Sequence, residues 1–142
     1  MLACTFFGHR DCPETIRTKL RSTLKDLIAE HNVDMFYVGN QGRFDALVRA
    51  ELCELQEEYP HIRYAVVLAY MPQKGSKDCY DTMLPEGIES VHPRYAISWR
   101  NNWMLQQSDY VVAYVAHSWG GAAQFLKAAE KKGIHITNLS VV

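Results

Sequence analysis

Three short segments of the chain combine glycine with polar side chains that can bind an anion. They read Gly8-His9-Arg10, then Gly39-Asn40-Gln41-Gly42 followed by Asp45, and finally Ser118-Trp119-Gly120-Gly121-Ala122. Glycine lets a ligand approach the main chain, and the free N–H groups at the start of a helix attract phosphate. An arginine such as Arg10 can hold a phosphate through two parallel hydrogen bonds. The three segments therefore predict a site for a phosphate-bearing ligand.

The third of these segments is the strongest phosphate candidate. Its two glycines, Gly120 and Gly121, precede a predicted helix whose first residues, Ala122 and Ala123, are too small to block the amides. The alternative is a tight turn from strand to helix, and Gly39–Gly42 leaves the same two interpretations open. Neither segment has the GxGxxG spacing of a dinucleotide site or the GK[ST] ending of a Walker loop. We therefore predict neither NAD nor any other cofactor.

The charged side chains of the first two segments each have a structural alternative to ligand binding. Arg10 could bind phosphate or pair with Asp11, and His9 could act on a ligand or be a hydrogen-bonded structural histidine. Asp45, one turn into its helix, could accept from a ribose hydroxyl, hold the Gly39–Gly42 amides or interact with the helix dipole. His9 and Asp45, together with Asn101, are the weak candidates for catalysis, and the sequence leaves open whether the chain is an enzyme.

A fourth group of candidates lies on a predicted helix over residues 94–107. Trp99 and Trp103 are four residues apart and share one face, which indicates either core packing or a ring that stacks on a base. Arg100 and Asn101 lie between them. Asparagine has a low helix propensity and two occur together here, so packing alone does not account for this pair. We include Arg100 and Asn101 among the ligand-binding candidates.

The elements that position these residues alternate regularly along the chain. Apolar runs predict five strands at 2–7, 35–38, 62–70, 110–115 and 134–139. Apolar stripes at helical spacing predict helices after Pro13, over 44–55, over 94–107 and over 120–132, the last stopped by Gly133. This order predicts one Rossmann-like domain over 1–142, a three-layer α/β/α fold with a mainly parallel five-stranded sheet. Ligands of such sheets bind beyond the carboxyl ends of the strands, where the three glycine segments fall.

Composition restricts the function classes. The formal net charge of −1 and the pI near 6.6 argue against a dedicated nucleic-acid binder. No apolar run approaches the roughly 20 residues that span a bilayer, so we expect no membrane segment and a cytoplasmic protein. The four cysteines match no metal spacing, so we predict reduced thiols and no metal site. Residues 71–92 are irregular, which is typical of a lid or a mobile loop, and Lys74-Gly75-Ser76-Lys77 is a solvated turn or a basic flap.

The chain resembles the YpsA/YoqJ-type branch of the SLOG superfamily, which also includes the LOG (Lonely Guy) phosphoribohydrolases and DprA. The resemblance rests on the stretches FFGHR, GNQGRFDALVRA and RNNWMLQQSDYVVAYVAHSWGGAAQFLKAAEKKG. It implies a Rossmann-like fold, a nucleotide-derived ligand and a homo-oligomer. The ligand-binding residues that it supports are Gly8, His9, Arg10, Gly39, Gly42, Asp45, Arg100, Asn101, Gly120 and Gly121.

One departure from that family bears on catalysis. The LOG enzymes carry a PGGxGTxxE motif whose glutamate serves in N-glycosidic cleavage. In the matching stretch here Trp119 replaces the proline, Gln124 the threonine and Leu126 the glutamate. Cleavage of a glycosidic bond needs a carboxylate, so that mechanism would need Asp45 or Glu51 in a suitable place.

Three hypotheses follow from these observations. The first is a module that binds or senses a nucleotide or a nucleotide-derived, phosphate-bearing molecule. The second is a hydrolase or transferase that acts on a nucleotide's N-glycosidic or phosphate bond. The third is an interaction protein with a vestigial pocket, in which Trp99 and Trp103 form an oligomer seam.

Overall fold

A computed structural model describes residues 2–71 and 82–140 of the chain. It shows a six-stranded parallel sheet in the order β4-β3-β2-β1-β5-β6. The strands are β1 (Leu2–Gly8), β2 (Val33–Val38), β3 (Arg63–Val67), β4 (Thr82–Met83), β5 (Tyr110–Tyr114) and β6 (His135–Asn138). The helices are α1 (Arg17–Glu30), α2 (Gly42–Glu58), α3 (Ala96–Gln107) and α4 (Gly121–Lys132). Short 3₁₀ turns cover Glu14–Ile16, Ile88–Ser90 and Pro93–Tyr95.

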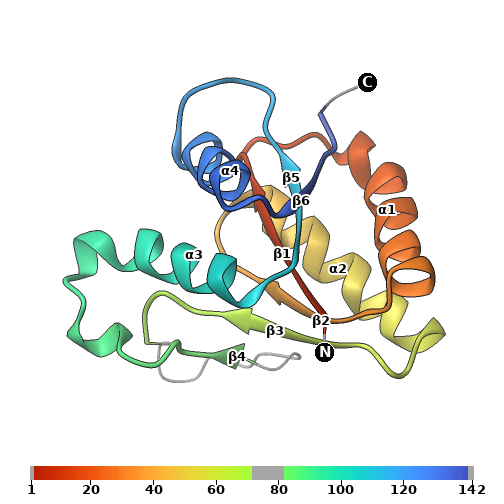
Figure 1. The fold of residues 1–142 in the computed structure, drawn as a ribbon, viewed down its shortest axis with the longest axis horizontal. Helices are drawn as coiled ribbons and strands as arrows, with labels where there is room; N and C mark the ends of the chain where they lie inside the picture. Colours follow the sequence, from red (N-terminus) through yellow and green to blue (C-terminus); the bar gives the residue numbers. More distant parts are fainter. Residues whose placement is uncertain (1, 72–81, 141–142) are drawn as a thin grey trace.

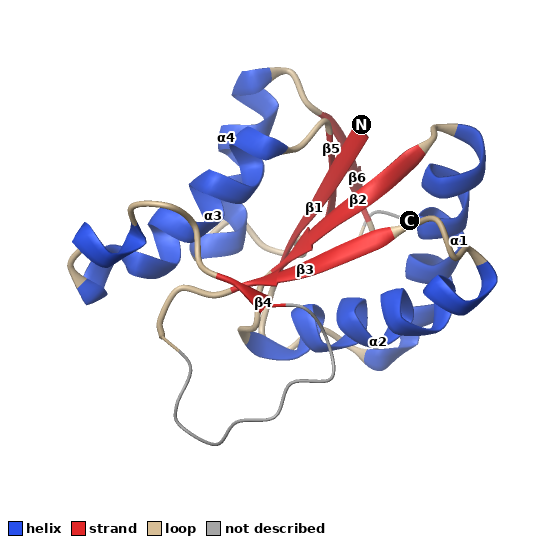
Figure 2. Cartoon of the chain, turned by 90° about the horizontal axis from the view of Figure 1, so that it is seen from below, coloured by secondary structure: helices blue, strands red, loops and turns tan. Residues whose placement is uncertain are grey.

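The helices cover both faces of the sheet. Helices α1 and α2 pack on one face and α3 and α4 on the other, as the two perpendicular views show (Figure 1, Figure 2). The hydrophobic core has a part on each side of the sheet, one centred on residues such as Phe36 and Leu52 and the other on Met104 and Phe125. The predicted Rossmann-like three-layer α/β/α fold is confirmed.

The central strand explains why the sequence favours this arrangement. Strand β1 is buried from Ala3 to Phe7 and pairs with β2 on one side and β5 on the other. A strand covered by helices on both faces must be apolar throughout, and β1 is, except for Thr5. The Thr5 hydroxyl donates to the Tyr37 carbonyl at 2.9 Å, so this buried polar group is satisfied.

Within residues 2–71 and 82–140 the sheet has six strands, one more than the five predicted. The additional strand, Thr82–Met83, pairs with Val66 and Val67 of β3. It is only two residues long and lies inside the irregular segment 71–92, where no apolar run marks it. The predicted Lys74–Lys77 turn or flap lies outside the described residues.

The ends of two helices show how local sequence sets the element boundaries. Helix α4 ends at Gly133, which adopts the left-handed conformation with φ +73°, and Lys131 and Lys132 occupy the last turn as predicted. Helix α1 begins at Arg17, later than Pro13 indicated, because a 3₁₀ turn over Glu14–Ile16 comes first. No helix in the part of the chain that the structure describes is long and apolar enough to cross a membrane.

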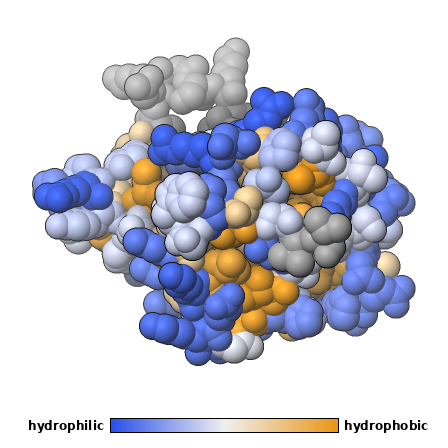
Figure 3. All heavy atoms as spheres, turned by 90° about the horizontal axis from the view of Figure 1, so that it is seen from above, coloured by the Kyte–Doolittle hydropathy of each residue, from blue (hydrophilic) through white to orange (hydrophobic). Residues whose placement is uncertain are grey.

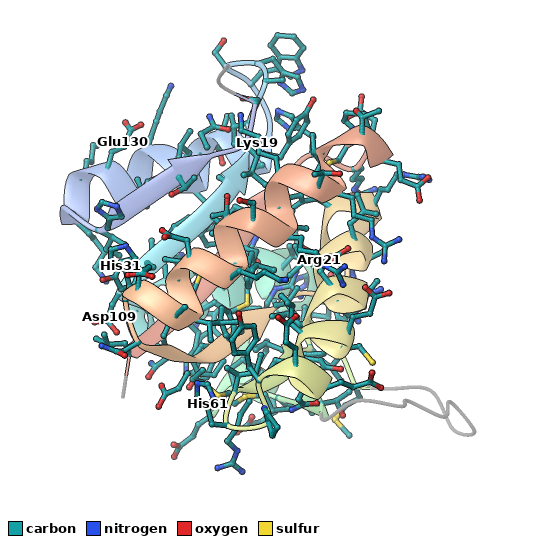
Figure 4. The ribbon with its side chains drawn as sticks, turned by 90° about the vertical axis from the view of Figure 1, so that its right-hand side faces the viewer. Lys19, Arg21, His31, His61, Asp109 and Glu130 are labelled. Carbon is teal, nitrogen blue, oxygen red and sulfur yellow. The ribbon has the colours of Figure 1, made fainter. Side chains whose placement is uncertain are left out.

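Helices α1 and α2 are joined by an ion-pair cluster around a buried carboxylate. The side chain of Glu51 is 3% exposed and accepts from the Nε atoms of Arg17 and Arg21, the latter at 2.8 Å. Both arginines also reach the exposed Glu54. Figure 4 shows Arg21 extending from α1 toward α2.

Replacing Glu51 with glutamine should lower the free energy of unfolding by about 2 kcal/mol, because two charge-assisted hydrogen bonds to a buried acceptor are weakened. Urea unfolding followed by circular dichroism measures this loss. Glu54→Gln is the matched control: its side chain is 52% exposed, so water screens its ion pairs and little stability should be lost. If both variants lose the same free energy of unfolding, the buried ion pairs of Glu51 do not stabilise the domain as described.

Candidate ligand-binding site at the carboxyl ends of the strands

A cavity of about 380 Å³ lies beyond the carboxyl ends of the central strands. The loops that follow β1 and β5 meet at this end of the sheet (Figure 1). Seen from above, the molecule shows a hydrophobic area below the centre of the view and smaller ones elsewhere, among hydrophilic residues (Figure 3). The lining comes from the end of β1, the β2–α2 loop, α3 and the β5–α4 loop: Phe6, Phe7, Gly8, His9, Arg10, Asp11, Gln41, Asp45, Ile97, Arg100, Asn101, Met104, His117, Trp119, Gly120, Gly121 and Ala122.

Arg100 is a buried cation in the lining of the cavity. The residue is 2% exposed, and its Nη1 donates to the Val67 carbonyl at 2.9 Å and to Asn40 Oδ1 at 3.2 Å. Its Nε donates to Asn101 Oδ1 at 2.8 Å. Its remaining nitrogen, Nη2, makes no hydrogen bond to a described residue and is not fully buried. Burial lowers the pKa of Arg100, opposed mainly by the nearby carboxyl of Asp45. The guanidinium is therefore held in position through Nε and Nη1, and Nη2 remains accessible to a ligand.

Asp45 places a carboxyl in the same buried region. It is 8% exposed, and its Oδ2 accepts from the Gln41 amide at 3.0 Å. Burial raises its pKa to about 6, although the Gln41 amide and the charges of Arg100 and Arg49 lower it. The charges of Asp45 and Arg100 influence each other, but the two side chains form no ion pair within the described structure. The hydrogen bond to Gln41 supports the interpretation that Asp45 orders the β2–α2 loop, and its place in the lining leaves it available to a ligand as well.

Gly39 makes this close arrangement possible, although it does not line the cavity. A Cβ atom at Gly39 would lie 2.7 Å from Asp45 Oδ2 and 3.0 Å from Arg100 Nη1. Gly42 has φ +82°, and a Cβ there would lie 3.0 Å from the Cα of Arg10. A side chain at either glycine would therefore disturb the packing around the site. Asn40 contributes through its hydrogen bond to Arg100, and Ser118 does not line the cavity.

His9 is held by hydrogen bonds on both its main chain and its ring. Its amide donates to the Tyr114 carbonyl at 3.2 Å, and its Nε2 accepts from the Ala116 amide at 3.0 Å. Burial lowers the pKa of His9, and the neighbouring His117 lowers it further. The ring is therefore neutral near pH 7 with its proton on Nδ1, which matches the structural interpretation. If His9 takes part in catalysis, only its Nδ1–H is available to a ligand.

Arg10 is exposed at the edge of the cavity. The predicted alternative, an ion pair with Asp11, is not formed in the described part of the chain. The carbonyl of Arg10 accepts from the Arg43 amide at 3.2 Å, which ties the loop after β1 to the start of α2. The guanidinium thus remains available to an anion.

The start of α4 provides open main-chain donors. Gly120 has φ +96°, a conformation that side chains disfavour, and Gly121 is the first helical residue. A Cβ atom at either glycine would meet nothing within 4 Å. Because the first N–H groups of a helix have no intrahelical partner, this turn presents an uncovered anion-binding surface to the cavity.

Three rings form a stack beside these glycines. The His9 and His117 rings lie 3.6 Å apart between centroids at an interplanar angle of 13°, and His117 and Trp119 lie 3.8 Å apart at 16°. His117 Nδ1 is also hydrogen-bonded to the Trp119 carbonyl at 2.9 Å. His117 was not among the site residues predicted from the sequence.

The two tryptophans of α3 do not line the cavity. Trp103 packs edge-on against Tyr37 with centroids 5.4 Å apart, and Trp99 lies next to Gly87. Both are partly buried, which supports the packing alternative over base stacking. The same helix contributes Ile97 and Met104, which the sequence analysis missed. Together with Arg100 and Asn101 these residues occupy positions i, i+3, i+4 and i+7, a spacing that could have identified the facing side of α3.

No carboxylate replaces the glutamate of the LOG motif. Laid residue by residue on Trp119–Lys127, that motif places its glutamate at Lys127, so the assignment to Leu126 was wrong by one residue. Leu126 packs against the second core cluster and Lys127 is exposed. Glu51 does not line the cavity, because it is paired with the arginines of α1. Asp45 is therefore the better placed of the two substitutes considered.

The described residues contain no group of three or more histidine, cysteine or acidic side chains that could hold a metal ion. Cys4, Cys12 and Cys53 are free thiols, and Cys79 lies outside the described residues. Burial raises the pKa of Cys12 to about 11, so this thiol is not activated by the helix that follows it.

Comparison with known proteins identifies the fold. No protein-family model and no curated protein matches the chain. The structure is similar to the X-ray structure of DNA processing protein A (DprA) from Streptococcus pneumoniae, with a TM-score of 0.69 and 15% sequence identity. The match covers 96% of this chain and 49% of that one, so the chain spans about half the length of DprA. The chain is thus a Rossmann-like α/β domain that shares its fold with part of DprA.

Proposed function

We propose that this domain binds a nucleotide or a nucleotide-derived, phosphate-bearing molecule in the cavity at the carboxyl ends of β1, β2 and β5. One observation carries the proposal: the same cavity is lined by the open helix start at Gly120-Gly121 and by Arg100, a buried cation that forms no ion pair with the described residues. Buried charges are normally paired with an opposite charge. An anionic ligand would supply that charge for Arg100.

The lining suits the parts of a nucleotide. The helix start and the exposed Arg10 offer donors to a phosphate at the rim. Asp45 can accept from sugar hydroxyls nearer the floor, and Ile97 and Met104 add apolar surface. The volume of about 380 Å³ falls at the lower end of the range for small-molecule sites.

The family resemblance supports the same proposal. The fold shared with DprA is consistent with a relation to the SLOG superfamily, whereas the YpsA/YoqJ branch rests on the sequence stretches alone. DprA is named for DNA processing. For this chain the net charge of −1 and the small cavity favour a free nucleotide over nucleic acid. Homo-oligomer formation is a further expectation from the resemblance, and light scattering after size exclusion tests it.

A thermal-shift panel of nucleoside mono- and diphosphates, ADP-ribose and cyclic nucleotides tests the proposal. At least one compound should raise the melting temperature, because a ligand that binds only the folded state stabilises it. Arg10→Ala should weaken the shift several-fold, and Gly121→Asp should abolish it by placing a negative charge at the helix start. Gly121→Ala is the control for Gly121→Asp, since a methyl group there meets open space. A panel without any shift, or shifts that both variants retain, would overturn the proposal.

Asp45 gives a specific reason to consider a second function, hydrolysis of the N-glycosidic bond of a nucleotide. It is a buried carboxyl in the cavity, and its pKa of about 6 suits proton transfer near neutral pH. Incubation of the protein with nucleoside monophosphates, followed by chromatography for free base, tests this function. We expect release that Asp45→Asn abolishes. An unchanged panel would exclude hydrolysis while leaving the binding proposal intact.

A further inference from the structure

Trp119 is an unusual surface residue because its large ring is both exposed and fixed. It is 69% exposed, although it carries the largest apolar side chain of any residue type. One face of the indole is covered by the parallel ring of His117, at 3.8 Å and 16°. The residue lines the mouth of the cavity and directly precedes Gly120 and Gly121. An exposed indole that only filled space would need no such support.

The support beneath Trp119 reaches into the core. His117 lies on His9 with centroids 3.6 Å apart, and His9 is 8% exposed. The His9 ring is anchored by the Ala116 amide and its main chain by the Tyr114 carbonyl. The contact between His117 Nδ1 and the Trp119 carbonyl fixes the turn that joins the two upper rings. Ligand binding therefore need not order this indole, which lowers the entropic cost of using it.

We propose that Trp119 is a stacking platform for the aromatic base of the nucleotide, which lies on the face of the indole that His117 does not cover. This inference rests on the proposed function and narrows its ligand class to nucleotides that keep their base. A phosphate at Gly121 and a base on Trp119 would bind adjacent residues, as the two ends of one nucleotide require. Every base has a π-face, so the platform favours bases over bare sugar phosphates without choosing among bases.

The platform replaces the base-stacking role considered for Trp99 and Trp103, which lie outside the cavity lining. It also gives a function to His117. The histidine acts as a positioning residue: it supports the indole from below without contacting the ligand through its own face.

Isothermal titration of the full chain with AMP and with ribose 5-phosphate, at one fixed salt concentration, tests the platform. The two probes share the pentose and the phosphate and differ in the base. Trp119→Leu should weaken AMP binding about tenfold and leave ribose 5-phosphate binding within about twofold of wild type. Trp119→Phe keeps an aromatic face and should retain most of the AMP affinity. Because Trp119 is exposed, unfolding curves should show equal stability for the three proteins.

Two other outcomes would contradict the platform, and the second of them would also contradict the proposed function. If Trp119→Leu leaves AMP binding unchanged, or weakens both probes equally, the platform is wrong while the phosphate site stands. If the wild-type chain binds neither probe and no compound of the thermal-shift panel, the proposed function fails and the platform fails with it.

Discussion

Replacing Gly8 with alanine should lower the melting temperature of this domain by about 10 °C. A Cβ atom at Gly8 would lie 2.3 Å from the Cγ and Cδ2 atoms of Phe44 and 2.7 Å from its Cβ. Phe44 is 1% exposed on the first turns of α2, so its ring has no free space to move into. Overpacking of this kind costs about 3 kcal/mol, and for a domain of this size each kcal/mol corresponds to about 3 °C. Differential scanning calorimetry measures the shift.

The matched control for this prediction is Gly121→Ala. Gly121 is also a glycine at a strand–helix junction of the site, but a Cβ there meets nothing within 4 Å. It should leave the melting temperature within about 2 °C of wild type. If Gly8→Ala is as stable as Gly121→Ala, then β1 and α2 do not pack as closely as described.

Replacing Asp45 with asparagine should stabilise the domain at neutral pH. Burial raises the pKa of Asp45 from 3.8 to about 6. The folded state therefore binds the proton more tightly than the unfolded state does. The stability that this provides is complete below pH 3.8 and is lost as the pH rises through about 6. With about 1.4 kcal/mol for each pKa unit, the loss approaches roughly 3 kcal/mol at pH 8. Asparagine carries no charge and can still accept from the Gln41 amide, so it avoids this loss.

Unfolding in urea at pH 4 and at pH 8 tests the sign of this effect. The difference between Asp45→Asn and wild type should be small at pH 4 and favour the variant by about 2–3 kcal/mol at pH 8. Asp11→Asn is the control, because Asp11 also lines the cavity but is exposed. If Asp45→Asn is no more stable than wild type at pH 8, burial does not raise the pKa of Asp45 as described. A carboxylate that lowers the stability of the folded domain is typical of a functional site.

The order of elements and the class of fold were predictable from the sequence. Strands such as β1 and β5 are short apolar runs, and α4 has an apolar stripe with a glycine stop, so local periodicity identifies them. The alternation of strands and helices then requires parallel pairing and places the glycine segments at one edge of the sheet. What local patterns could not predict was β4, because two residues carry no periodicity and the strand depends on its pairing with β3.

The sequence by itself thus determined the fold class and the edge of the sheet where chemistry is expected, since both follow from residue types along the chain. Only the tertiary structure decided where each candidate lies relative to the others. It placed Arg100 and Asp45 together in the buried part of the cavity and left Gly39 and Gly42 outside the cavity lining. It also stacked His117 and Trp119 on His9. These outcomes depend on distances between residues remote in sequence, and burial and pKa follow from those distances.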